Sequence, residues 1–392
     1  MLISIAYIII IGLLMGKIFK VLKLPALMGM LIAGIIIGPF GLNLIDDTIL
    51  NVSSELRKIA LIIILIRAGL NLDLNDLKKI GRPAILMSFV PACFEILGMI
   101  IIGKLLLGLS ILDCALLGSV IAAVSPAVVV PKMLNIMQEG YGLDKRIPQL
   151  ILAGASIDDV FVIVMFYTFL GLSLGDSVSL INFINIPLSI ILGIILGLLI
   201  GKILSLYFRN FHIRDSIKVI LLLSISFILV YIEDNYSNII NFSSLIAIMS
   251  IGVSLLKNEQ LVAKRLSLKF EQLWVSAEIF LFVLVGASVN INYAFTIGFK
   301  SILIIFIVLL FRMVGVLVSL IKTNLNYKER LFCMLGYTPK ATVQAAIGGI
   351  ALSMGIESGD IILTIAVVSI LVSAPLGAFM IDLTYKKLLN KS

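Results

Sequence analysis

The chain has 392 residues, of which 61% are hydrophobic and only 13% are charged. A soluble domain is usually about half apolar and about a quarter charged, so the composition excludes an ordinary soluble fold and indicates an integral membrane protein. The net charge of +8 does not point to nucleic acid here; basic residues instead mark loops that face the cytoplasm.

Apolar runs separated by short polar loops follow one another along the chain. A helix needs about 20 apolar residues to cross the hydrocarbon core. The sequence predicts an all-α polytopic membrane protein, a single membrane domain over 1–392, with about thirteen transmembrane helices at 2–20, 25–41, 57–72, 82–107, 112–135, 147–171, 181–206, 216–232, 240–257, 272–289, 298–321, 329–353 and 360–383. The first run has no basic stretch before it, so we interpret it as a span and not as a cleaved signal peptide.

The basic residues predict the orientation of these spans. With the N-terminus outside and the C-terminus in the cytoplasm, four of the 30 Lys and Arg residues lie on the outer side: Arg57, Lys58, Lys104 and Lys300. Three more lie inside spans, which leaves 23 on the cytoplasmic side, as the positive-inside rule requires. The abundance of isoleucine and lysine favours a bacterial source, and we expect the protein in the cell membrane.

Metal and cofactor chemistry finds little support in the sequence. His212 is the single histidine, and Cys93, Cys114 and Cys333 have no metal-site or disulfide spacing. We therefore expect free thiols, no histidine-based metal site and no cofactor.

Ionisable residues occur inside the predicted spans, although each costs at least about 2.5–3.5 kcal/mol at mid-bilayer unless it finds a partner or water. They are Arg67, Glu95, Asp158, Asp159, Glu278, Arg312 and Lys340. Arg67 and Glu278 lie near span ends, where they can reach loop charges. Arg312 stays charged and needs a partner, for which Glu95 and Asp158 are both candidates. The four acids and three bases lack one positive charge, which a monovalent cation or a proton can supply.

Asp158 and Asp159 stand together near the middle of the sixth predicted span. Adjacent helical residues point about 100° apart, so one carboxylate can face an aqueous cavity while the other faces a neighbouring helix. Ser156 lies on the same face as Asp159 and can add an oxygen. A carboxylate that binds either a proton or a cation couples two opposing fluxes; the alternative is a pair held in salt bridges. Because adjacent side chains diverge too far to share a water, the pair does not fit an aspartic protease, and no enzyme activity is expected.

Two predicted spans contain a hydroxyl–proline step near their middle. Ser125 and Pro126 interrupt the fifth span, and Thr338 and Pro339, followed by Lys340, interrupt the twelfth. Proline removes a backbone donor, and broken backbone at membrane depth is tolerated only where it is buried or lines a cavity. Each step alone can be a simple kink. Because the two spans cross in opposite directions, matching breaks indicate the binding site of a transporter built from inverted halves.

Four segments carry a resemblance to a known family: Leu65–Leu70, Ala123–Pro131, Ser156–Asp159 and Thr338–Gly348. On these motifs the chain resembles the cation–proton antiporter superfamily, and within it the branch that includes the animal NHA-type sodium/proton exchangers. The resemblance implies inverted repeats with two crossed broken helices. It also implies a homodimer in which a transport part, 82–171 and 298–383, moves against a dimerisation part, 1–81 and 172–297.

The resemblance also assigns roles near the ion. Asp159 matches the acid that binds the cation and the proton, and Asp158 matches the additional acid of the two-aspartate members. Ser125, Ser156 and Thr342 match positions close to the ion. The implied function is an antiporter that exchanges Na⁺ or Li⁺ for H⁺ by alternating access. The expected partners are these ions, the lipid bilayer and a second copy, with no nucleic acid.

The basic residues of the family motifs leave the stoichiometry open. Lys340 resembles the basic residue beside the second break, and Arg312 resembles one that pairs with Glu95 or Asp158. Many electrogenic relatives have a lysine where Arg312 stands, and arginine does not titrate, so an electroneutral exchange is possible. K⁺/H⁺ antiport and sodium-coupled symport of an organic solute on the same architecture remain alternatives; the two aspartates argue against an anionic substrate.

Overall fold

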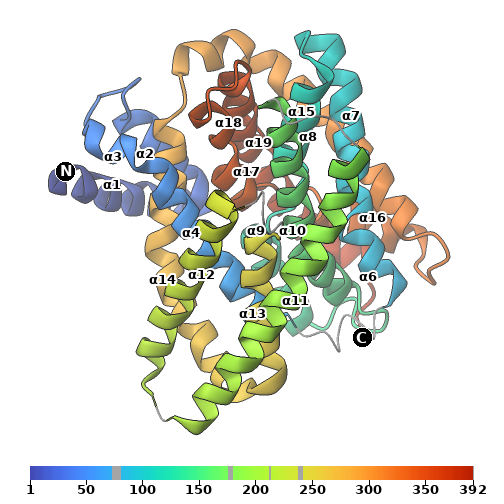
Figure 1. The fold of residues 1–392 in the computed structure, drawn as a ribbon. Coiled ribbons are helices and arrows are strands. Elements are labelled where there is room, and N and C mark those ends of the chain that lie inside the picture. Colours follow the sequence, from blue (N-terminus) through green and yellow to red (C-terminus); the bar gives the residue numbers. More distant parts are fainter. Residues whose placement is uncertain (73–80, 175–179, 212, 237–241, 392) are drawn as a thin grey trace. The chain divides into compact units, whose positions relative to one another are not determined.

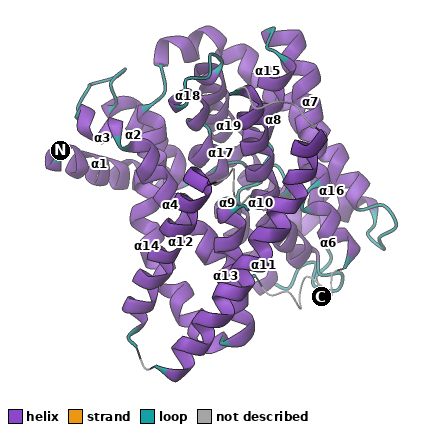
Figure 2. Ribbon diagram, viewed as in Figure 1, coloured by secondary structure: helices purple, strands orange, loops and turns teal. Residues whose placement is uncertain are grey.

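The structure is a computed structural model that describes residues 1–72, 81–174, 180–211, 213–236 and 242–391. Within these ranges the chain is helical and contains no strand (Figure 2). The helices labelled in Figure 1 are α1 Leu2–Val21, α2 Ala26–Ile37, α3 Asp47–Asn51, α4 Ser53–Asn71, α6 Arg82–Met87, α7 Val90–Leu107, α8 Ile111–Ile121, α9 Pro126–Gln138, α10 Ile147–Ser173, α11 Leu180–Asn210, α12 Asp215–Tyr236, α13 Ser244–Asn258, α14 Gln260–Ala287, α15 Ile291–Ser319, α16 Tyr327–Gly336, α17 Thr342–Ile347, α18 Ile350–Ser353 and α19 Gly359–Leu388.

The predicted all-helical polytopic fold is confirmed. Nine helical segments of the described part are long and apolar enough to cross a membrane, and three shorter apolar helices accompany them, at Ala26–Ile37, Ser244–Asn258 and Thr342–Ser353. Every predicted span overlaps one helix or a run of two or three consecutive helices. The number of thirteen crossings stays a prediction.

The two predicted breaks occur where the prolines placed them. Helix α8 ends at Ile121 and α9 begins at Pro126, while α16 ends at Gly336 and α17 begins at Thr342. In both places the chain runs for several residues without helical structure.

A third interruption was not predicted. The segment 82–107, expected as one helix, is divided at Ser88 and Phe89 into α6 and α7. Pro91 lies in the first turn of α7 and lacks the amide hydrogen that a continuous helix would donate to the carbonyl of Met87. That carbonyl accepts a hydrogen bond from the hydroxyl of Tyr337 instead, at 3.0 Å.

The chain divides into two compact units. One unit comprises Met1–Glu55, Asp76–Leu174 and Ile279–Ser392, and the other comprises Leu56–Asn75 and Gly175–Glu278. Both broken helices belong to the first unit. Which part of the chain moves and which part dimerises remains a prediction.

The second unit is held by close helix packing and by ion pairs. A Cβ on Gly197 of α11 would lie 2.2 Å from the carbonyl oxygen of Ala247 in α13, so these two helices pack with their backbones in near contact. Lys58 pairs with Asp234 at 2.7 Å, and Arg67 pairs with Glu271 at 3.1 Å. Arg67 therefore binds an acid of its own unit.

In the first unit, a buried apolar cluster surrounds the second break. Val124, Ala155, Phe332 and Tyr337 belong to it and are nearly inaccessible to solvent. Helix α15 packs along α7, and α7 packs against α8. The backbone groups at the second break, which lack partners within their own helix, are therefore enclosed by apolar side chains and removed from bulk water.

The end of α9 is tied to α19 in the same unit. Lys132 pairs with Asp382. The hydroxyl of Tyr385 donates to Glu139 at 2.8 Å, and this hydrogen bond, helped by Lys386, lowers the pKa of the Glu139 carboxyl. The half-helix α9 is thus fastened to α19 by an ion pair and a hydrogen bond.

Helix α2 and the last turn of α14 approach through glycines. A Cβ at Gly34 would lie 2.0 Å from the carbonyl oxygen of Val283, and one at Gly286 would lie 2.1 Å from that of Leu31. Backbone cannot move aside as a flexible side chain can, so only glycine fits at this contact.

We predict that Gly34→Ala lowers the melting temperature of the purified protein in detergent, because forced overlap in a packed interior costs typically about 1–3 kcal/mol. The matched control is Gly298→Ala in α15, where a Cβ meets nothing within 4 Å. That change should leave the melting temperature unchanged or raise it, since alanine is favoured in helices by up to about 1 kcal/mol. Equal melting temperatures for the two variants would contradict the described packing.

Candidate ion-binding site

Four charged side chains form a buried cluster beside the breaks. The guanidinium of Arg312, from α15, lies 2.8 Å from Glu95 of α7 and 2.7 Å from Asp158 of α10. The ammonium of Lys340, in the second break, lies 2.6 Å from the other oxygen of Glu95. The sequence predicted either Glu95 or Asp158 as the partner of Arg312, and in the structure Arg312 pairs with both.

Each of these four side chains is at most 1% exposed. Transfer of an ion from water to a protein interior costs several kcal/mol even after relaxation, so such charges are stable only when paired. Two acids and two bases cancel, and the quartet of Glu95, Asp158, Arg312 and Lys340 is neutral as a set.

The cations of the quartet also bind the C-terminal end of α8. The carbonyl oxygen of Ile121 accepts from Lys340, and that of Ala122 accepts from Arg312. The last carbonyls of a helix lack intrahelical partners and carry about half a negative charge. Lys340 and Arg312 supply both the hydrogen-bond donors that these carbonyls lack and positive charge that compensates the helix end.

The second break is bound to the first. Arg312 donates its Nε hydrogen to the carbonyl of Tyr337 at 2.7 Å, and its guanidinium carbon lies 5.1 Å from the centre of the Tyr337 ring, a cation–π contact. The amide of Ser125 donates to the carbonyl of Pro339 at 2.8 Å. The unwound backbones of the fifth and twelfth spans therefore meet, beside the charged quartet.

The N-terminal ends of the two following half-helices carry hydroxyl groups. Ser125 precedes α9 as its cap residue, but its side chain makes no capping hydrogen bond, and Thr342 begins α17. Next to Ser125, the amide of Val124 donates to Asp158 at 2.8 Å. This bond fixes one oxygen of Asp158 at the first break.

Several buried side-chain oxygens at this place have no hydrogen-bond partner among the described residues: Ser125 Oγ, Asp158 Oδ1, Asp159 Oδ1, Thr342 Oγ1 and Gln344 Oε1. Buried polar atoms are normally paired, and an unpaired one costs about 1–3 kcal/mol. Oxygen atoms are also the ligands that hard cations prefer. Buried oxygens without a partner, on α10 and at both breaks, are what a dehydrated cation needs.

Asp159 differs from the other acids of the cluster. Asp159 is 9% exposed, and its carboxylate forms no ion pair with any of the described residues. Beside a neutral quartet, an ionised Asp159 leaves one negative charge uncompensated. A proton or a monovalent cation can supply the missing charge.

Other predicted residues lie elsewhere or cannot be placed. The side chain of Ser156 and the whole of His212 lie outside the described residues. Glu278 and Arg67 belong to the second compact unit and not to the unit of the quartet. Over the described part of the chain, no group of three or more His, Cys, Asp or Glu residues gathers as a polydentate metal site would require.

Tyr337 and Gln344 were not predicted as site residues. Both stand at the second break or directly after it. A polar glutamine within an otherwise apolar run is a signal that would have singled out Gln344. Tyr337 gave no such signal, because a tyrosine in an apolar span usually packs as an aromatic residue.

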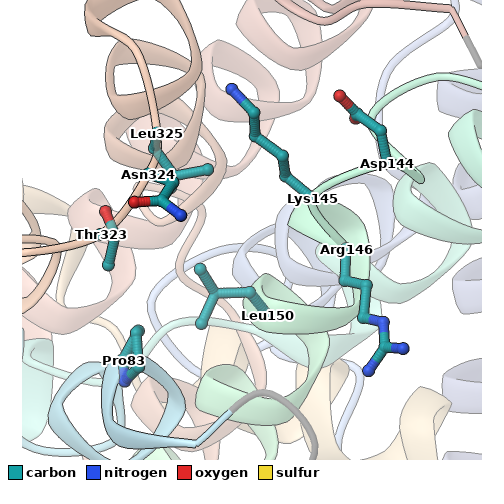
Figure 3. Close-up of a pocket in the computed structure, with 8 residues that line it drawn as sticks. All are labelled: Pro83, Asp144, Lys145, Arg146, Leu150, Thr323, Asn324 and Leu325. Carbon is teal, nitrogen blue, oxygen red and sulfur yellow. The ribbon is translucent and has the colours of Figure 1, made fainter.

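A surface pocket of about 430 Å³ lies near the start of α10 (Figure 3). Pro83, residues 144–146, Leu150 and residues 323–325 line it. None of the predicted site residues is among them, so the pocket is distinct from the charged quartet and its unpaired oxygens.

Comparison with known proteins agrees with an ion-binding site between two broken helices. Residues 5–387 match the family described as "Sodium/hydrogen exchanger, transmembrane". Human sodium/hydrogen exchanger 9B2 is 33% identical over 402 residues, which cover 96% of this chain and 73% of the relative. The chain belongs to the sodium/hydrogen exchanger family. The exchanger 9B2 from Xenopus tropicalis is likewise 33% identical, over 401 residues, with the same coverage of both chains.

A solved structure shows the same fold as this exchanger-family chain. The sodium proton antiporter MjNhaP1 from Methanocaldococcus jannaschii superposes with a TM-score of 0.86 over 98% of this chain and 97% of that protein, at 23% sequence identity. The predicted resemblance to cation–proton antiporters is confirmed.

We predict that Glu95→Gln strongly destabilises the protein, by about 3–5 kcal/mol, because it leaves Lys340 and part of Arg312 buried without their counter-charge. The measurement is the melting temperature in detergent. Glu139→Gln is the control: Glu139 pairs with Lys386 at 3.5 Å while 37% exposed, and such surface pairs contribute about 0–1 kcal/mol. A Glu95→Gln variant as stable as Glu139→Gln would show that the quartet is not held by charge pairing.

Proposed function

We propose that the protein is a secondary active antiporter that exchanges Na⁺, or Li⁺, for H⁺ across the cell membrane. The observation that carries the proposal is Asp159, a buried carboxylate without an ion pair in the described structure, in the helix that presents Asp158 to the two breaks. The names of the relatives, sodium/hydrogen exchangers and a sodium proton antiporter, support Na⁺ and H⁺ as the exchanged ions.

Charge balance explains how one site couples the two ions. With the quartet neutral, the Asp159 carboxylate is compensated either by a proton or by a cation, and the two exclude each other from the same oxygens. A conformational change with neither ion bound would carry an uncompensated buried charge, which is costly. The site therefore changes sides only when it is loaded, and each crossing of a cation requires the return of a proton.

The cation is held by a few converging oxygens. Asp159 and Asp158 each offer one unpaired carboxylate oxygen, and Ser125 and Thr342 each offer a hydroxyl. We also propose Ser156 as a ligand, because it lies three residues before Asp159 on the same face of α10. The positive N-terminal end of α9, which begins directly after Ser125, moderates the negative charge of the two acids.

The movement follows the general scheme of transporters with broken helices, in which one part of the protein rocks against another around a fixed site. We propose 82–171 with 298–383 as the moving part and 1–81 with 172–297 as the dimerisation part of a homodimer. The distribution of basic residues supports an N-terminus outside and a C-terminus in the cytoplasm.

Proton flux in liposomes tests the proposal. With a pH-sensitive dye inside, addition of Na⁺ or Li⁺ outside should drive protons out of the vesicles, and Asp159→Asn should reduce the response to that of protein-free liposomes. Asp234→Asn is the control, since Asp234 pairs with Lys58 in the other unit and is half exposed; it should transport normally.

One result would contradict the antiporter, and another would change only the ion. Folded protein that responds to none of Na⁺, Li⁺ and K⁺ would favour symport of an organic solute. A response to K⁺ alone would keep the mechanism and change the ion.

We further predict that the exchange is electroneutral. Arg312 does not titrate and holds Asp158 ionised in the quartet, so only Asp159 exchanges a proton for a monovalent cation. The Na⁺-driven proton flux should then keep the same rate when valinomycin and K⁺ clamp the membrane at zero or at negative potential. A rate that rises or falls with the clamped potential would show that Asp158 or Lys340 also exchanges a proton.

A further inference from the structure

Gln344 lies in the interior beside the first break. It stands on α17, two residues after Thr342, and is fully buried. Its side-chain nitrogen donates to the carbonyl of Ala123 at 2.8 Å and to that of Ile121 at 3.3 Å. The side-chain amide of Gln344, in the second broken helix, is thus hydrogen-bonded to the carbonyls at the end of α8, in the first broken helix.

These two bonds fix which way the amide faces. Only the NH₂ group of a glutamine can donate to a carbonyl, so the nitrogen must lie toward Ala123 and Ile121. The oxygen Oε1 is turned away from those carbonyls, and it is buried without a hydrogen-bond partner among the described residues.

The surroundings of this oxygen indicate what it binds. The carbonyl that holds the amide nitrogen belongs to Ala123, two residues before Ser125, and Thr342 stands on the same short helix as Gln344. Both hydroxyls are themselves buried and unpaired. Oε1 lacks a donor beside the first break, where the hydroxyl of Ser125 is also unpaired, and a cation is a partner that such oxygens bind.

We propose that Gln344 supplies Oε1 as a neutral ligand to the transported cation; this inference rests on the proposed function. A carboxylate oxygen binds a proton as readily as a cation, whereas an amide oxygen binds the cation only. Gln344 therefore favours the cation in its competition with the proton. Because two hydrogen bonds fix its reach, it also discriminates among Li⁺, Na⁺ and K⁺ by size.

The test compares three variants in the liposome assay, with the half-saturating concentrations of Na⁺ and Li⁺ as the readout. Gln344→Met keeps the length of the side chain and removes the oxygen; it should raise the half-saturating Na⁺ concentration about tenfold, the equivalent of roughly 1.4 kcal/mol, and change the Li⁺ to Na⁺ preference. Gln344→Glu keeps an oxygen and adds a group that binds a proton as well as a cation; its half-saturating Na⁺ concentration should therefore rise more steeply as the pH falls than that of the parent.

Gln149→Met is the matched control. Gln149 is a partly buried glutamine whose Oε1 also lacks a partner among the described residues, but it lies more than two turns before Asp158, near the start of α10. It should leave both half-saturating concentrations unchanged. If Gln344→Met does not fold, the comparison of Gln344→Glu with the parent still decides the question.

Two outcomes would overturn the proposal. In one, Gln344→Met keeps the half-saturating concentrations and the Li⁺ to Na⁺ preference of the parent. In the other, the half-saturating Na⁺ concentration of Gln344→Glu depends on pH as that of the parent does, which would mean that this side chain does not meet the ion. If the parent protein itself shows no cation-driven flux, the proposed antiport fails instead, so the two failures are distinguishable.

Discussion

The guanidinium of Arg312 joins four helices in the interior of one unit. Its three nitrogens bind Glu95 of α7, the carbonyl of Ala122 at the end of α8, Asp158 of α10 and the carbonyl of Tyr337 after α16. Because an arginine in a protein stays ionised, each of these partners must remain an acceptor. The ionised state of Asp158 depends on this side chain, which also joins the two breaks together with the bond from the Ser125 amide to the Pro339 carbonyl.

A fixed, neutral quartet gives the neighbouring Asp159 its function. If the quartet carried a surplus positive charge, Asp159 would be paired internally and would have no need of an ion from solution. If Lys340 or Arg312 were absent, Glu95 or Asp158 would need its own proton, and more than one group would titrate. The number of exchanging groups therefore follows from the balance of buried charges, and the identity of the cation follows from the oxygens around it.

The sequence predicted those features that depend on local chemistry. Pro126 and Pro339 locate the breaks because proline acts on its own turn, and the cost of a charge in the bilayer singled out Glu95, Asp158, Asp159, Arg312 and Lys340. Whether Arg312 meets Glu95 or Asp158 was left open, because Glu95 and Arg312 are 217 positions apart and their distance depends on how α7, α10 and α15 pack.

Two further features depend on the same packing. The division of 82–107 was missed, since Pro91 is tolerated in the first turn of a helix and the lost bond is replaced by Tyr337, far along the chain. The orientation of the Gln344 amide depends on the carbonyls of another helix, which no local pattern reveals.

The central claim is that cation and proton compete for Asp159, and proton release on cation binding tests it most directly. When Na⁺ is added to purified protein in weakly buffered detergent solution, the account predicts release of up to about one proton per chain, as expected when a ligand must lose its proton to bind a metal ion, and no release from Asp159→Asn. Binding of Na⁺, seen as thermal stabilisation, with no release from the parent, or equal release from Asp159→Asn, would contradict the account.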